Sequence, residues 1–182
     1  ALNAVIGGWQ TSMIFLAQTG PFLTPFLGSN VVDPSGSGSG LSRNQHPDRI
    51  GNGNISNPTR DQWFDVNAFV CPGLATRVAG NCRIGINPTR DAAPIGRFGN
   101  AGVGILTGPG TINLSLGVNK AFYLTEKVRL EAGVSFTNIA NHVNLADPQL
   151  NVTSTAFGRI TRARSSELGG SRTGQVSMRL SF

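Results

Sequence analysis

The last nine residues of the chain alternate between apolar and polar side chains, and this pattern predicts an extended strand with two different faces. The apolar face would carry Val176, Met178, Leu180 and Phe182, and the polar face Gln175, Ser177, Arg179 and Ser181. The apolar series runs to the terminal carboxylate and ends on an aromatic side chain. Such a strand is typical of the end of a membrane β-barrel, but it also occurs at the end of soluble β proteins. Two interpretations therefore have to be separated, a piece of a membrane barrel and a soluble β protein.

Residues 111–138 show the same alternation twice, on either side of a short polar segment. The apolar positions of the two runs are Ile112, Leu114, Leu116 and Val118, followed by Val128, Leu130, Ala132, Val134 and Phe136. The segment Thr125-Glu126-Lys127 predicts a compact turn between them, so we expect one long antiparallel hairpin. Each run is longer than the usual strand of about 5–6 residues, and a tilted strand needs ~9–11 residues to cross an outer membrane. Strand length therefore favours the membrane interpretation.

Residues 1–18 predict a further strand, because the alternation continues from Trp9 to Gln18. Ile14 and Leu16 interrupt its polar face, so we expect this strand to be buried on both sides for part of its length. The segments 19–110 and 139–173 are rich in Asn, Gly, Ser, Pro and Thr, and we expect long loops there. A short turn at one end of the strands and long loops at the other is typical of outer-membrane barrels.

Together these segments predict an all-β chain of long antiparallel amphipathic strands from a β-barrel, with long irregular loops. We expect a single β-rich unit over residues 1–182. Its parts are the strand 1–18, the loop-rich segment 19–110 with weak strands near 64–70 and 98–106, the hairpin 111–138, the loop 139–173 and the terminal strand 174–182. About five to seven strands are too few to close a receptor-sized barrel, since even small barrels need ~8.

The composition agrees with strands that have one apolar and one polar face. Charged residues make up 13% of the chain, against ~25% in an average soluble domain. The longest apolar run, Met13–Ala17, is far shorter than the ~20 residues of a spanning helix, which argues against a helical membrane protein. The net charge of +6 comes with no nucleic-acid motif, so we expect no nucleic-acid partner. No basic residue precedes the first apolar stretch, and we therefore expect no signal peptide and a numbering that begins inside a longer precursor.

The two cysteines, Cys71 and Cys82, lie in a segment that contains Pro and Gly. A structural zinc site usually needs four ligands, and only His46 and His142 are available elsewhere, so we expect no metal site. We expect a disulfide instead. It would close a short loop, stabilise the fold by about 3 kcal/mol and imply an oxidising compartment.

Motifs for catalysis and for cofactor binding are not found in the sequence. The segment Gly102–Gly108 misses the dinucleotide-binding spacing and Pro109 follows it, where a helix would have to continue. His46 and Asp48 have no nucleophile paired with them, and they are expected in a solvated loop. We therefore expect no catalytic residue, no cofactor and no enzymatic activity.

Three aromatic residues, Trp9, Phe122 and Tyr123, stand near the ends of predicted strands. One interpretation is an aromatic girdle at a membrane interface, where amphipathic rings lie at the level of the lipid head groups. The other is ordinary core or cross-strand packing. The sequence leaves both open.

A series of short motifs follows a characteristic order along the chain. They are Gly8–Met13, Gln18–Phe22, Trp63–Phe69, Gly96–Asn100, Gly108–Gly110, Asn113–Leu116, Lys120–Phe122, Leu130–Ala132, Phe136–His142, Phe157–Ile160 and the terminal strand. The series resembles the C-terminal β-barrel portion of TonB-dependent outer-membrane receptors, in the acidobacterial subgroup that has a carboxypeptidase-regulatory-like domain. The resemblance implies a parent protein that binds or takes up a ligand with energy from TonB. The chain lacks the plug domain, the TonB box and most strands of that family, so uptake is implied for the parent.

An open sheet of long amphipathic strands has two unpaired edges and an exposed apolar face. We expect these to be covered by the missing strands of the parent barrel and by outer-membrane lipid, or by other copies of the chain. The second case gives an alternative hypothesis, in which the fragment self-assembles by edge-strand pairing into an oligomer, a tube or an extracellular filament. A soluble β-sandwich binding module is a third hypothesis, which the low charge and long strands disfavour. The expected location is the bacterial outer membrane for the parent, and extracellular for an assembled fragment.

Overall fold

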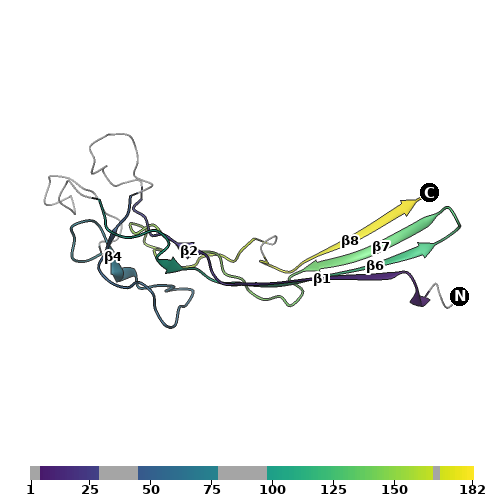
Figure 1. The fold of residues 1–182 in the computed structure, drawn as a ribbon, viewed down its shortest axis with the longest axis horizontal. Coiled ribbons are helices and arrows are strands. Elements are labelled where there is room, and N and C mark those ends of the chain that lie inside the picture. Colours follow the sequence, from purple (N-terminus) through teal and green to yellow (C-terminus); the bar gives the residue numbers. More distant parts are fainter. Residues whose placement is uncertain (1–4, 29–44, 78–97, 166–168) are drawn as a thin grey trace. The chain divides into compact units, whose positions relative to one another are not determined.

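A computed structural model describes residues 5–28, 45–77, 98–165 and 169–182, and its regular structure is almost entirely β (Figure 1). The strands are β1 (Trp9–Gln18), β2 (Phe22–Leu23), β3 (Asp48–Arg49), β4 (Phe69–Val70), β5 (Leu106–Thr107), β6 (Thr111–Tyr123), β7 (Arg129–Thr137) and β8 (Thr173–Ser181), with one 3-10 helix, η2 (Val66–Ala68). The strands pair as the sheets β1-β6-β7-β8, β2-β5 and β3-β4, all antiparallel. The predicted fold class is therefore confirmed, and the described sheets do not close into a barrel.

The chain divides into two compact units, each described by itself. The sheet unit consists of Ala1–Thr19, Gly110–Leu145 and Ala163–Phe182, and the loop unit consists of Gly20–Pro109 and Ala146–Arg162. The expectation of one β-rich unit over residues 1–182 stays a prediction.

The predicted hairpin forms the centre of the sheet unit. Strands β6 and β7 pair from Leu116 opposite Phe136 to Tyr123 opposite Arg129. The turn between them is closed by a hydrogen bond from the Leu124 amide to the Val128 carbonyl at 2.9 Å, and the Thr125 hydroxyl oxygen accepts from the Val128 amide at 3.1 Å. The compact turn that the polar residues predict is therefore confirmed.

Strand β1 differs from its sequence-based interpretation. Its expected burial on both sides is wrong, because all ten residues of β1 are exposed in the described part of the chain. The physical reason is that no described segment packs on either face of β1, and its pairing with β6, the one described strand it pairs with, lies in the plane of the sheet and covers neither face. Ile14 and Leu16 are apolar residues on an exposed face rather than buried ones.

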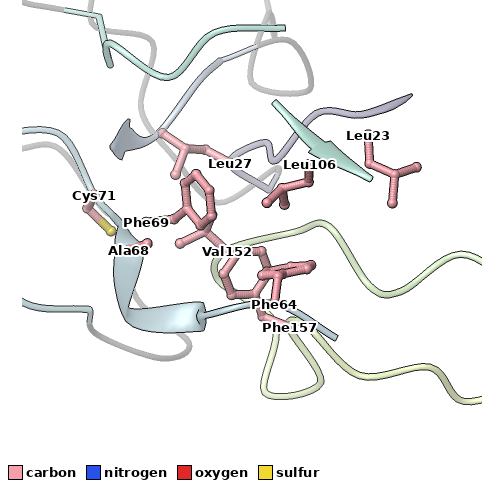
Figure 2. Packing of buried hydrophobic residues seen from close by; sticks show 9 residues of the cluster. All are labelled: Leu23, Leu27, Phe64, Ala68, Phe69, Cys71, Leu106, Val152 and Phe157. Carbon is pink, nitrogen blue, oxygen red and sulfur yellow. The ribbon is translucent and has the colours of Figure 1, made fainter. Parts of the chain in front are cut away.

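The loop unit has a hydrophobic core of its own, although two-residue strands and irregular segments build it. Its buried members are Leu23, Leu27, Phe64, Ala68, Phe69, Cys71, Leu106, Val152 and Phe157 (Figure 2). The rings of Phe64 and Phe157 lie edge to face with their centroids 5.0 Å apart, and Phe69 packs edge-on against both. Strands β4 and β5 fall at the ends of the two ranges predicted as weak strands, whereas β2 and β3 have no counterpart among the predictions.

Polar contacts tie distant segments of the loop unit together. The buried carboxylate of Asp48 accepts hydrogen bonds from the amides of Gly73 at 2.8 Å and Asn100 at 3.3 Å. The guanidinium of Arg77 lies 5.2 Å from the centre of the Phe157 ring and donates to the Ser154 carbonyl at 2.8 Å. Desolvation by burial lowers the pKa of Arg77, but a guanidinium remains charged at neutral pH. These contacts hold segments 48–49, 73–77, 100 and 154–157 in fixed positions without long strands.

Candidate functional site: the amphipathic sheet

The strand register sorts the side chains of the four-stranded sheet by polarity. Residues directly opposite each other in paired strands share a face, so each row across the sheet can be assigned from the register. Three rows are Thr11–Val118–Val134–Val176, Met13–Leu116–Phe136–Gly174 and Phe122–Leu130–Leu180. The alternate rows contain Ser12–Gly117–Ser135–Gln175 and Gln10–Asn119–Gly133–Ser177. One face is thus apolar across all four strands, and the other is mainly polar.

The apolar face is exposed over much of its area in the described structure. Met13 is 70% exposed and Val176 is 80% exposed, and Phe15, Ile112, Met178 and Leu180 are also exposed. Continuous apolar surface of this kind usually marks a site of contact with protein or lipid. The apolar face is therefore the first part of the candidate functional site.

A lysine lies on this apolar face, at the end of the sheet where β1 begins. Lys120 stands opposite Trp9 and Ala132 in the register and is only 7% exposed. Its ammonium donates to the carbonyls of Val5 at 2.9 Å and Gly7 at 3.0 Å. It also lies 4.4 Å from the centre of the Trp9 ring. Carbonyl dipoles and ring faces thus surround the ammonium. Their interactions with the charge offset the desolvation cost of burying a lysine at an apolar position.

The cluster of Lys120, Trp9 and Phe122, here called the Lys120 cluster, was not identified from sequence patterns. The ring of Phe122 completes it, with its centre 5.3 Å from the ammonium. A signal was present, because Lys120 occupies an apolar position of the alternation between Val118 and Phe122. A lysine at such a position, three residues before the end of β6, indicates a cluster that compensates its charge, and the structure contains one.

The three predicted girdle residues fall on two different faces. Trp9 and Phe122 lie on the apolar face beside Lys120, whereas Tyr123 lies on the polar face, where the Arg129 guanidinium is 5.6 Å from its ring centre. A girdle residue has to face lipid. The girdle therefore stays a prediction for all three residues, and the ring of Tyr123 also packs against the Arg129 side chain of the neighbouring strand.

The terminal strand forms β8, the second edge of the sheet. Val176, Met178 and Leu180 lie on the apolar face, and Phe182 follows the last strand residue and is almost fully exposed. Among the described strands, β1 pairs only with β6 and β8 only with β7. Each edge therefore presents backbone groups that can pair with a further strand.

Two buried asparagines fix the long connection that leaves the sheet after β7. Asn138 has a left-handed backbone with φ of 52°, and its side-chain amide donates to the carbonyls of His142 at 2.8 Å and Gly170 at 2.5 Å. Asn144 accepts a hydrogen bond from the Ile112 amide and donates one to the Ile112 carbonyl, both at 2.8 Å. The side chain of Asn144 therefore satisfies the backbone N–H and C=O groups of Ile112, near the start of β6, as a neighbouring strand would.

We expect Asn144→Ala to lower the free energy of unfolding of the sheet unit by about 2–3 kcal/mol, because it leaves two backbone groups of Ile112 without these partners. Urea titration followed by Trp9 fluorescence in a Trp63→Phe background measures the change. Val143→Ala is the matched control, since Val143 is the preceding residue and is exposed. Equal stability of the two variants would contradict the role of Asn144.

Only one of the two cysteines of the predicted disulfide lies in the described residues. Cys71 is buried in the core of the loop unit, and Cys82 lies outside the described residues. The pairing stays a prediction. We expect the intact mass of the purified chain to be ~2 Da lower than after reduction, because a disulfide lacks two hydrogen atoms, and an unchanged mass would reject it.

The described residues contain no group of three or more His, Cys, Asp or Glu side chains that could hold a metal ion. His46 and Asp48 are both part of the loop unit, and the expectation that they are solvated is wrong for Asp48, because its carboxylate is buried and accepts the backbone amides described above. His142 follows β7 in the sheet unit, and its amide donates to the Asn138 side chain. No helix within the described part of the chain is long and apolar enough to cross a membrane.

Comparison with known proteins gives one family. Residues 1–175 match the family model described as outer membrane beta barrel domain. No curated protein and no solved structure matches the chain significantly.

Proposed function

Because this chain belongs to the outer membrane beta barrel domain family, we propose that its four-stranded sheet is a section of the wall of such a barrel. The apolar face contacts the lipid, and the polar face lines the interior of the barrel. The role is non-enzymatic, since the wall separates lipid from an aqueous interior and carries no chemistry of its own. Membership of the family supports an outer-membrane location.

The sorting of side chains over the two faces carries this proposal. Barrel strands in the outer membrane alternate between apolar residues that face lipid and polar residues that face the interior. The sheet follows this rule over its four strands, and β6 and β8 contain 13 and 9 residues. At ~3.4 Å per residue and ~45° of tilt, such strands span roughly 20–30 Å of membrane thickness. The apolar band of outer-membrane barrels is ~25 Å tall.

We propose further that the parent protein binds or takes up a ligand with energy from TonB, as the resemblance to TonB-dependent receptors implies. In this proposal the short turn at residues 124–128 faces the periplasm, since periplasmic turns are short and external loops are long. The long connections that leave the other end of the strands then lie on the external side.

The two edges of the sheet, which pair with no further strand among the described residues, favour a second candidate function, self-assembly. All neighbouring strands are antiparallel, so β1 and β7 run in one direction and β6 and β8 in the other. Strand β8 of one copy would therefore meet β1 of the next copy in antiparallel orientation. Such head-to-tail pairing produces rings or open filaments. Analytical ultracentrifugation in detergent distinguishes the barrel-wall function from self-assembly. A wall section without its other strands stays a monomer, whereas a self-assembling chain gives larger species.

Quenching of tryptophan fluorescence by brominated lipid tests the lipid-facing surface. The chain has two tryptophans, and Trp9 lies on the apolar face of the sheet, whereas Trp63 packs against the core of the loop unit and donates to the Thr107 carbonyl. In vesicles, we expect strong quenching of Trp9 in a Trp63→Phe variant and weak quenching of Trp63 in a Trp9→Phe variant. Equal quenching of both residues would overturn the assignment of the apolar face to lipid.

A further inference from the structure

The polar face of the sheet contains a hollow that the role of a barrel wall does not require. It has a volume of about 360 Å³ and lies near the end of the sheet that contains the β6–β7 turn. Ligand pockets in proteins begin at about this size. Its lining comes from all four strands and from Gly8, which precedes β1. The side chains that matter for binding are Gln10, Asn119, Arg129, Glu131, Ser177 and Arg179.

The floor of the hollow is a glycine. A Cβ atom at Gly133 would lie 2.1 Å from Asn119 Oδ1 and 2.8 Å from Ser177 Oγ, closer than real Cβ atoms come. The polar ends of Asn119 and Ser177 therefore reach over Gly133 and offer an amide and a hydroxyl to the hollow. Any larger residue at position 133 would displace them.

The charges around the hollow leave one arginine available. Glu131 forms an ion pair with Arg129 at 2.5 Å, and the Arg129 guanidinium also lies over the Tyr123 ring. Arg179 stands directly opposite Glu131 in the register, and no ion pair of Arg179 within 4 Å occurs in the described residues. The ammonium of Lys120 is held by two carbonyls and does not offset Glu131. The hollow therefore has an excess of positive charge at Arg179.

We propose that this hollow binds the oxyanion group, carboxylate or phosphate, of a small solute, and that Arg179 is its main charged partner. The planar guanidinium presents paired N–H donors that match both groups, and Ser177 on the same strand and face supplies a further donor. Glu131 limits the affinity, because its carboxylate repels an anion and competes for Arg179. The anion site rests on the proposed barrel-wall function in one respect, because a solute reaches the hollow only if the polar face of the sheet is open to water.

Titration calorimetry of the chain in detergent micelles tests the site, with succinate and inorganic phosphate as probes and uncharged succinamide as the control. We expect Arg179→Gln to weaken succinate binding about ten- to a hundredfold, since a charge-assisted contact is lost. Arg172→Gln is the matched control, because Arg172 is exposed and does not line the hollow. We expect Glu131→Gln to tighten binding about two- to fivefold through loss of the repulsion. Tighter binding of phosphate than of succinate would identify a phosphate-bearing solute, and the reverse a carboxylate-bearing one.

Opposite effects of the two substitutions separate a binding site from a structural ion-pair network, in which both would only destabilise the sheet. Equal affinity of Arg179→Gln and Arg172→Gln, or binding of succinamide as tight as that of succinate, would overturn the proposal. So would absence of binding by the Trp63→Phe chain when its Trp9 fluorescence shows a folded sheet. Brominated-lipid quenching reports on the other face, so failure of the anion site and failure of the lipid-facing assignment give different results.

Discussion

We expect Phe69→Ala to lower the free energy of unfolding of the loop unit by about 3–5 kcal/mol, the usual cost of removing a fully buried phenylalanine ring. Phe69 has no exposed surface, and its ring centre lies 6.0 Å from that of Phe64 and 6.2 Å from that of Phe157. Truncation removes both edge-on contacts and leaves a cavity that irregular segments fill poorly. Urea titration followed by Trp63 fluorescence in a Trp9→Phe background measures the loss, because Trp63 packs against this core.

Phe22→Ala is the matched control for this experiment. It changes the same residue type within the same unit, but Phe22 is 80% exposed. We expect its effect to stay within about 0.5 kcal/mol, as for most surface substitutions. If both variants lose the same stability, the loop unit does not have the core described above.

For the chain folded in lipid vesicles, we expect Val134→Arg to lower the free energy of unfolding by about 2–4 kcal/mol. Val134 is near the middle of β7 on the apolar face, opposite Val118 and Val176. An arginine at mid-membrane depth on the lipid side of a barrel has this cost, because its guanidinium loses water and gains no partner. Trp9 fluorescence in a Trp63→Phe background follows the unfolding of the sheet unit.

Ser135→Arg provides the control, since Ser135 is the next residue of β7 and lies on the polar face. We expect its effect to stay within about 1 kcal/mol, because the introduced charge remains in water. If Ser135→Arg lowers the free energy of unfolding as much as Val134→Arg does, the assignment of the two faces is contradicted, whatever the absolute stability of the chain.

The strands and the turn of the sheet unit could be predicted from local patterns. A period of two residues is a property of the extended backbone itself, so it predicts both the strand and the two faces of residues such as Val134 and Ser135. Thr125, Glu126 and Lys127 predict the turn for an equally local reason, since a turn hydrogen-bonds within a few residues. The polarity of the two faces, which carries the proposed function, was therefore readable from the sequence.

The core of the loop unit could not be predicted in this way. Leu27, Phe69 and Val152 meet although they are far apart in the chain and follow no period, since residues in irregular segments point in directions that no repeat describes. The same holds for the contact of Arg77 with Phe157, which joins segments eighty residues apart. Composition alone predicts loops there, and loops can be compact when a few buried rings hold them together.

The sequence by itself determined the extended backbone, the polarity of each face and the turn after β6, because these depend on neighbours within a few residues. Tertiary structure alone decided which side chains become partners. It placed the Lys120 ammonium between carbonyls and the Trp9 ring, set Asn144 against Ile112, and left Arg179 facing the hollow without an ion pair in the described residues. The physical reason is register: only the pairing of whole strands brings such residues within hydrogen-bond or Coulomb distance, and the sequence of any one strand does not contain it.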